Sequence, residues 1–316
     1  MSEVSIKYHR NQDRGLKLFL KLVRRDWLLI MCCLPALSAF IVFYYLPMAG
    51  VYMAFTNFKI NLGIFGSPFI GIKWFMQFFN SPFFLRLLRN TLTISVYSLL
   101  WGFWVPILFA IMLNEISGDR FRRIVQSISY FPYFISVVVV VGIMVNMFGI
   151  NDGVINAIRD DMGLAKIDFM KSVQWFRTMY IGSGIWQGFG FSAVIYIGAI
   201  SSIDPQLYEA ATVDGASRLR RIWHITLPGI LPVAITLLIL AIGGMINVGF
   251  EKIILMYDGA NYEVSDVIST YVYRRGLVGG EYSFGAAIGL FNSVANLIMI
   301  TAANIISRRV SGVYLW

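Results

Sequence analysis

Charged residues are scarce in this chain of 316 residues, and that scarcity argues against an ordinary soluble domain. Only 14% of the residues are Asp, Glu, Lys or Arg, whereas soluble domains carry about 25%. Hydrophobic residues make up 58% of the chain, and the mean hydropathy is +0.69. This composition is typical of an integral membrane protein.

Cysteine and histidine are nearly absent. The two cysteines, Cys32 and Cys33, are adjacent within an apolar stretch, so they provide no disulfide framework. The only histidines are His9 and His224, and a metal site built on histidine is therefore not expected.

Sequence motifs of nucleotide-binding and hydrolytic enzymes are missing as well. No glycine in the chain is followed by lysine, so the phosphate-binding pattern GxxxxGK[ST] cannot occur. The patterns GxSxG and HExxH are also absent. We therefore expect no catalytic residue, no metal and no cofactor in this chain.

What the chain does have is a series of long apolar stretches without charge. A bilayer core needs about 20 apolar residues per helix. Six stretches are long enough, at 28–56, 90–114, 124–150, 178–203, 225–250 and 282–307. The sequence thus predicts an all-α integral membrane protein with six transmembrane helices. A basic tail (1–27) would precede the membrane domain (28–307), and a short tail (308–316) would follow it.

The distribution of lysine and arginine predicts which side of the membrane each end faces. Seven basic residues precede the first stretch, and only Lys59 lies near its far end. Because basic residues concentrate on the cytoplasmic side, both termini are expected to be cytoplasmic. Residues 74–85, which are rich in aromatics, are expected to form a short helix at the outer interface.

One polar segment, 204–232, interrupts the apolar chain between the fourth and fifth stretches. Asp204 and Pro205 favour a helix start, and Asp214 with Gly215 favours its end. A second short helix is expected to follow. Its apolar stripe would consist of Leu219, Ile222, Trp223 and Thr226. The residues alone leave two interpretations open: a docking surface for a partner protein, or an interfacial loop whose arginines contact lipid head groups.

The same segment contains a recognisable pattern. It comprises Glu209-Ala210-Ala211, Asp214-Gly215-Ala216 and Ile225-Thr226-Leu227-Pro228. This pattern resembles the EAA motif of membrane subunits of bacterial ABC importers, which forms the coupling helices that sit in a cleft of the ATPase subunit. The resemblance implies ATPase-coupling roles for Glu209, Ala210, Ala211, Asp214, Gly215, Leu219, Ile222 and Pro228. Ile222 departs from the family pattern, where an aromatic residue is common, but it is also bulky and apolar.

The resemblance extends along most of the chain. The stretches 44–48, 67–71, 130–136 and 266–273 look like those of carbohydrate-uptake permeases of the maltose type, in a branch that carries complex polysaccharide fragments. The resemblance implies that the chain forms half of a translocation pathway for an oligosaccharide. It also implies four partners: a second homologous permease subunit, two ATP-binding subunits that hold ATP and Mg, and an extracellular sugar-binding protein. A uronate-containing sugar is suggested by the resemblance alone, because the outer basic residues are mixed with acidic ones.

Polar and aromatic side chains within the predicted spans are candidates for contacting the sugar. They are Trp186, Gln187, Tyr196, Asn247, Asn292 and Asn296. Buried amides in lipid are costly unless they are paired or face water, so hydrogen bonding between helices is the other open interpretation. Packing is the alternative for the two aromatic residues.

Two other classes of function are compatible with part of this pattern. A membrane-bound enzyme acting on lipid-linked sugars would need loop carboxylates around a metal, and Asp160-Asp161 is the only candidate pair. An ion-driven secondary transporter would need more charge within the membrane. Copurification of an ATPase, activity of the isolated chain, or uptake that depends on an ion gradient would distinguish the three classes.

Overall fold

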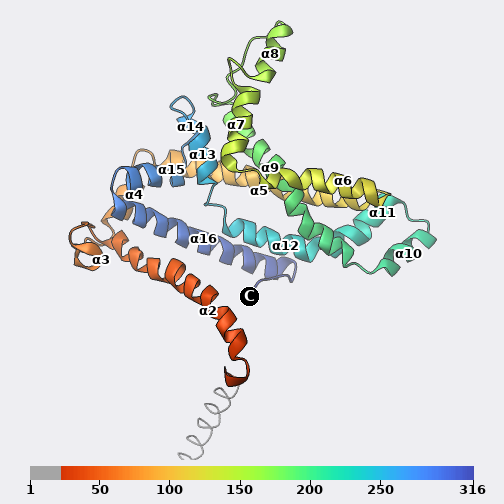
Figure 1. Cartoon of the computed structure of the whole chain (residues 1–316), viewed down its shortest axis with the longest axis horizontal. Coiled ribbons are helices and arrows are strands. Elements are labelled where there is room, and N and C mark those ends of the chain that lie inside the picture. The colour runs from red at the N-terminus through yellow and green to blue at the C-terminus, as the bar shows by residue number, and fades with distance from the viewer. Residues whose placement is uncertain (1–22) are drawn as a thin grey trace, which may run out of the picture. The chain divides into compact units, whose positions relative to one another are not determined.

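The computed structural model describes residues 23–316, which are almost entirely helical (Figure 1). The basic residues Lys7, Arg10, Arg14, Lys17 and Lys21 of the predicted tail lie outside the described residues. Extended pairing in the described part is limited to two isolated bridges, Thr56 with Phe69 and Lys59 with Gly63. The chain divides into two compact units, the first ending at Gly71 and the second beginning at Ile72.

The first unit is built on one continuous apolar helix, Trp27–Phe55. It begins as α2 (Trp27–Phe40), widens to a π-helical turn, η1 (Ile41–Tyr45), and tightens to a 3-10 segment, η2 (Leu46–Phe55). No residue of α2 is buried within the chain. Since its side chains are apolar, this helix suits a lipid environment, as the predicted span 28–56 requires. The short helix α3 (Gly63–Gly66) follows.

Four further helices, all in the second unit, are long and apolar enough to cross a membrane. They are α5 (Phe84–Asn114), α9 (Phe176–Ser201), the continuous helix Arg218–Gly243 that ends in α12 (Leu227–Gly243), and α16 (Tyr282–Val310). Helix α5 packs along α9, and α12 packs along α16. The chain therefore has five helices of spanning length among its described residues.

The third predicted span, 124–150, is not one straight helix. It consists of α6 (Asp119–Tyr130), the turn η3 (Phe131–Phe134) and α7 (Val137–Phe148), with a bend of 100° between the two halves. The break has a local cause: Ile135 and Ser136 are extended, and the Ser136 side chain accepts a hydrogen bond from the Val139 amide to begin a new helix. The described residues thus hold five straight candidate spans, or six if this bent pair crosses the membrane as one span.

Close packing between the long helices depends on small residues. A side chain at Gly190 of α9 would collide with the backbone of Ser129 in α6, because its Cβ would lie 2.1 Å from the Ser129 carbonyl oxygen. A Cβ at Gly243 of α12 would lie 2.7 Å from Ile300 of α16. These contacts follow the rule that small residues let membrane helices approach closely.

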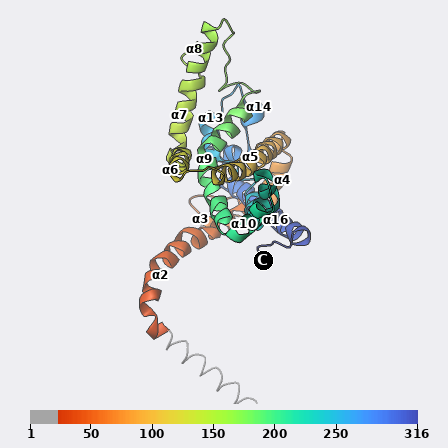
Figure 2. The same cartoon turned by 90° about the vertical axis from the view of Figure 1, so that its right-hand side faces the viewer.

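The remaining elements of the second unit are short. They are α4 (Lys73–Phe79), α8 (Val154–Asp161), α10 (Pro205–Val213), α11 (Arg218–Arg221), η4 (Ile222–Thr226), α13 (Phe250–Met256), α14 (Tyr262–Ser265), α15 (Ile268–Val272) and η5 (Tyr273–Val278). Helices α7 and α8 project from the rest of this unit in both views (Figures 1 and 2).

The predicted helix at 74–85 is shorter than expected, since α4 ends at Phe79 and α5 begins at Phe84. Phe78 of α4 is buried in an apolar cluster with Leu87 and Phe284. Its aromatic side chain thus belongs to the core of the unit rather than to a membrane interface.

Candidate functional site

Helix α10 opens the 204–232 segment and has the ends predicted from the sequence. The Asp204 carboxylate accepts a hydrogen bond from the Gln206 amide at 2.9 Å, and Pro205 occupies the first turn. At the other end Gly215 is left-handed, with φ +74°. The amides of Gly215 and Ala216 donate to the carbonyls of Thr212 and Ala211, which completes a Schellman cap.

The second helix of this segment differs from the expectation of a separate short helix. After Ser217 caps α11, the chain continues through the π-helical turn η4 directly into α12. The expected apolar stripe is divided: Leu219 and Trp223 are exposed, whereas Ile222 packs against the core and Thr226 is buried. Because the turn is continuous with the fifth span, a force on its first residues is transmitted directly to that helix.

Two side-chain hydrogen bonds join α10 to the start of the fifth span. The hydroxyls of Tyr208 and Thr226 lie 3.0 Å apart, and the Arg221 guanidinium donates to the Thr212 hydroxyl at 2.9 Å. Pro228 and Pro232 both lie within α12 itself. These two hydrogen bonds could not be predicted from helix periodicity, because Tyr208 and Thr226 are 18 residues apart and Thr212 and Arg221 are 9 residues apart.

The outward surface of the segment combines apolar and charged side chains. Val213 is 88% exposed and Leu219 is 70% exposed. The other predicted coupling residues are Glu209, Ala210, Asp214 and Pro228, which are exposed, and Ala211, which is half-buried. None of the ion pairs among residues 23–316 includes Glu209 or Asp214. These side chains are thus available to a partner.

Of the candidate sugar-contacting residues, Gln187 lines a cavity between α5 and α9, Tyr196 lines the adjoining cavity, and Trp186 lines a third. Gln187 donates to the Ile135 carbonyl at 2.8 Å, so it holds the break between α6 and α7. Tyr196 is buried in the apolar core, and Trp186 lines a separate apolar cavity beside α7. Packing or helix bracing thus accounts for most of what these three side chains contact.

The three asparagines also occupy different surroundings. Asn296 accepts a hydrogen bond from the Ile246 amide at 3.2 Å and thereby supports the turn after α12. Asn247 is exposed in that turn. The amide oxygen of Asn292 is buried and has no hydrogen-bond partner among the described residues. Of the three, only Asn292 leaves a buried polar atom for another molecule to satisfy.

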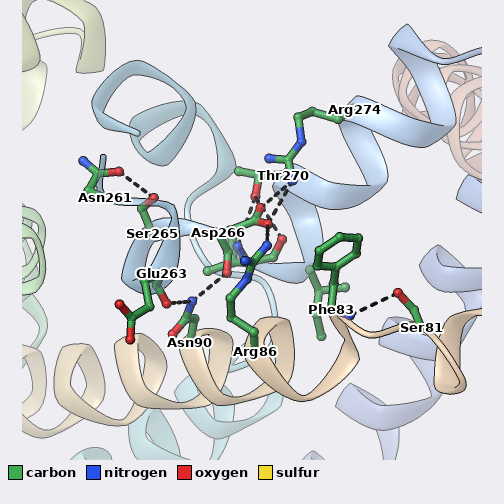
Figure 3. A network of polar contacts seen from close by, with 12 residues as sticks. Ser81, Phe83, Arg86, Asn90, Asn261, Glu263, Ser265, Asp266, Thr270 and Arg274 are labelled. Carbon is green, nitrogen blue, oxygen red and sulfur yellow. Dashed lines mark hydrogen bonds and ion pairs between the residues drawn. The ribbon is translucent and has the colours of Figure 1, made fainter. Parts of the chain in front are cut away.

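A second polar region, which the sequence analysis did not predict, surrounds Asp266 (Figure 3). We call it the Asp266 network, and it consists of Arg86, Asn90, Asp266, Thr270 and Arg274. The buried Asp266 carboxylate is paired with Arg86 at 3.0 Å and with Arg274 at 2.8 Å, and it accepts a hydrogen bond from Thr270 at 2.9 Å. Such a carboxylate is stable in the interior because its lone pairs are satisfied.

The Asp266 network joins three parts of the second unit. Arg86 and Asn90 come from the start of α5, and the side-chain amide of Asn90 donates to the backbone carbonyls of Glu263 and Asp266. Arg177, at the start of α9, donates to the Asn90 amide oxygen at 3.3 Å. Burial would lower the pKa of Arg274, but the Asp266 carboxylate raises it above its ordinary value. The network therefore holds charged side chains in place between helix ends.

Neither region offers a metal site, since residues 23–316 contain no cluster of three or more His, Cys, Asp or Glu side chains suited to one. The two cysteines are free and exposed. The 204–232 segment provides an exposed surface, and the Asp266 network holds helix ends together.

Known proteins resemble this chain over most of its length. Residues 102–312 match the family described as "Binding-protein-dependent transport system inner membrane component". The chain is 41% identical over 298 residues to the polygalacturonan/rhamnogalacturonan transport system permease protein YteP of Bacillus subtilis (strain 168), covering 94% of this chain and 92% of that protein. It is 40% identical over 296 residues to Protein LplB of the same bacterium, covering 94% and 93%.

Two solved structures also superpose closely. One is a bacterial ABC transporter involved in the import of the acidic polysaccharide alginate, with a TM-score of 0.85 and 44% identity over 93% of this chain and 99% of that chain. The other is the bacterial alginate transporter in complex with an alginate pentasaccharide-bound periplasmic protein, with a TM-score of 0.85 and 43% identity over the same shares.

Proposed function

We propose a substrate and a coupling mechanism on one premise: this chain belongs to the family of binding-protein-dependent transport system inner membrane components. It is therefore the permease subunit of an ABC importer, a multi-pass protein of the inner membrane without a catalytic site of its own. ATP binds to the partner ATPase subunits. This membership decides against both the membrane-bound enzyme and the ion-driven transporter.

The substrate that we propose is an oligosaccharide that contains uronate units. Two relatives at more than 40% identity over more than nine-tenths of this chain support it: one is named for polygalacturonan and rhamnogalacturonan, and the other for import of the acidic polysaccharide alginate. Both names refer to polymers with carboxylate groups on the sugar ring.

The assembly that we propose has five proteins. This chain pairs with a second, homologous permease, so that each contributes half of the pathway, and two ATP-binding subunits drive the pair. An extracellular binding protein delivers the sugar. Both termini and the 204–232 segment face the cytoplasm, in agreement with the seven basic residues before the first span.

In the coupling mechanism that we propose, the 204–232 segment docks into the ATPase subunit. Exposed Val213 and Leu219 supply apolar contacts, and Glu209 supplies a charge for a basic group of the ATPase. The observation that carries this mechanism is the pair of hydrogen bonds, Tyr208 with Thr226 and Arg221 with Thr212, that makes α10 and the fifth span one body. Closure of the ATPases would then turn the span and switch the pathway between outward-open and inward-open.

The test is the Gly215→Pro variant in the complete importer. Proline fixes φ near −65° and cannot adopt the φ of +74° found at this position, so the Schellman cap of α10 would be lost. We expect the variant to insert into the membrane normally, to lose its copurifying ATPase subunit and to abolish uptake of an oligogalacturonate.

Gly163→Pro is the matched control. Gly163 also has a left-handed φ, +70°, and follows the end of α8. The same pair of cap hydrogen bonds occurs there: the Gly163 amide donates to the Asp160 carbonyl, and the Leu164 amide donates to the Arg159 carbonyl. The backbone damage is thus equivalent, but it lies outside the 204–232 segment. We expect this variant to retain the ATPase subunit. Normal uptake and normal ATPase retention in Gly215→Pro would refute the coupling mechanism.

A further inference from the structure

Lys252 is a buried cation that forms no ion pair with any other of the residues 23–316. Lys252, in α13 just after the fifth span, is only 8% exposed. Its ammonium group donates one hydrogen bond, to the carbonyl oxygen of Tyr180 at 2.9 Å, and lies 5.1 Å from the centre of the Tyr180 ring.

This arrangement contrasts with that of three partly buried arginines of the second unit. Arg86 and Arg274 share the Asp266 carboxylate, and Arg275 pairs with Glu281. A buried charge without a partner is costly, and an ammonium can donate three hydrogen bonds, of which one is used here. Burial lowers the pKa of Lys252 to about 8, so the group is still mostly protonated at neutral pH. Two of its N–H bonds are therefore available to a ligand.

The Lys252 ammonium lines a cavity between α5 and α9. The cavity has a volume of about 280 Å³, and its lining includes the polar residues Lys252, Tyr180, Ser98, Gln187 and Ser192. Gly184 lies beside the ammonium: a Cβ built there would be 3.5 Å from the lysine nitrogen. Since glycine has no side chain, the space next to the charge is open.

A larger cavity adjoins the first. It has a volume of about 660 Å³ and shares Ser98 and Ser192 with the first. Its wall includes the stacked rings of Tyr133 and Phe191, whose centroids are 4.0 Å apart. Sites for organic ligands combine apolar or aromatic walls with a few polar groups, in volumes of about 300–1,000 Å³. The two cavities together have this character.

We propose that Lys252 binds the carboxylate of a uronate unit while the sugar is inside the permease, with the hydroxyls of Ser98 and Ser192 facing the sugar hydroxyls. An ammonium paired with a carboxylate makes a charge-assisted hydrogen bond, which is stronger than a neutral one. This inference rests on the proposed substrate and adds a residue that would select for it. Lys252 is thus a specificity residue, and Gly184 keeps its anion site open.

The first test uses uptake of trigalacturonate by the complete importer in liposomes, with saturating binding protein. We expect Lys252→Met to lower uptake at least about tenfold, since it removes one partner of a buried charge pair. Lys252→Arg keeps the charge and should stay within about threefold of wild type. Lys171→Met, at an exposed lysine of the 151–177 segment, should leave uptake unchanged. ATPase activity without sugar should be the same in all four proteins.

The second test asks whether the sugar touches Lys252. A water-soluble carbodiimide activates a carboxylate, and an amine held against that carboxylate then displaces the urea to form an amide without a spacer. Treatment of the wild-type importer with trigalacturonate should therefore give a sugar adduct on the Lys252 peptide, detected by mass spectrometry. Lys252→Arg should abolish that adduct, and the fully methyl-esterified trisaccharide should give none. A lysine that only braced Tyr180 would give no adduct.

These outcomes separate the inference from the function on which it rests. If the wild-type importer carries no trigalacturonate, the proposed substrate and this inference both fail. If the wild type carries it and Lys252→Met carries it equally well, or if adducts form only on exposed lysines, the inference alone is overturned.

Discussion

Charged side chains occupy two contrasting regions of this chain, the 204–232 segment and the Asp266 network. In the first, Glu209, Asp214 and Arg218 are exposed, and none of them forms an ion pair with another of the residues 23–316. In the second, one fully buried carboxylate is paired with two guanidinium groups. The charges of the segment thus remain available to another protein, whereas the carboxylate of the network is paired within the chain.

The contrast suggests a division of labour within the permease. A region whose buried charges are paired with one another is costly to disrupt, because removing one partner leaves the other charge enclosed and unpaired. A region whose apolar and charged side chains face outward contributes little to the fold, but is suited to docking. Mutations in the network should therefore reduce stability, and mutations in the segment should reduce coupling.

The largest effect on stability is expected from Asp266→Asn. The substitution leaves Arg86 and Arg274 enclosed without their carboxylate, and breaking a buried pair in this way costs about 3–5 kcal/mol. The free energy of unfolding of the purified chain in detergent, or its melting temperature, measures the loss.

Asp160→Asn provides the matched control for that variant. Asp160 pairs with Lys166 at 3.3 Å, but the side chains are 66% and 40% exposed. Exposed ion pairs contribute about 0–1 kcal/mol, so the melting temperature should barely change. Equal losses in the two variants would remove the distinction between the two regions.

A smaller effect, on coupling rather than on stability, is expected from Tyr208→Phe. The variant removes the hydroxyl that contacts Thr226, a bond of about 1 kcal/mol, but keeps the ring. The docked ATPase would then move the fifth span less effectively. We expect the number of sugars imported per ATP to fall about two- to fivefold, while the ATPase remains bound.

Tyr45→Phe is the control for this measurement, because Tyr45 is exposed on the first span. Its ratio of sugars to ATP should equal that of the wild type. A wild-type ratio in Tyr208→Phe as well would show that the hydroxyl pair does not transmit the motion.

Features set by neighbouring residues could be predicted from the sequence. Asp204, Pro205 and Gly215 set the ends of α10 through contacts within two to five residues, and both ends were found correctly. The long apolar helices could be predicted because the length and hydropathy of a span are set by one continuous stretch of sequence. The break at Ser136 was missed because it lies within an uncharged run, and a serine cap there does not alter the hydropathy.

Features that depend on distant residues could not be predicted. Arg86 is 180 residues from Asp266, and Lys252 is 72 residues from Tyr180, so no local pattern joins either pair. From the sequence alone, these side chains could be described only as basic and acidic residues mixed in the outer segments. The fold shows that one group of them is paired and that Lys252 is not.

The most direct test of the central claim, that the 204–232 segment receives the ATPase, is the amount of ATPase subunit that copurifies with Leu219→Asp. The leucine is 70% exposed, so a carboxylate there should leave the melting temperature of the chain unchanged. Leu164→Asp, at an exposed leucine after α8, is the control and should retain the ATPase. We predict that the copurifying ATPase falls at least about tenfold in Leu219→Asp, since a buried unpaired charge in an interface is strongly unfavourable. Wild-type amounts of ATPase in Leu219→Asp would contradict the claim.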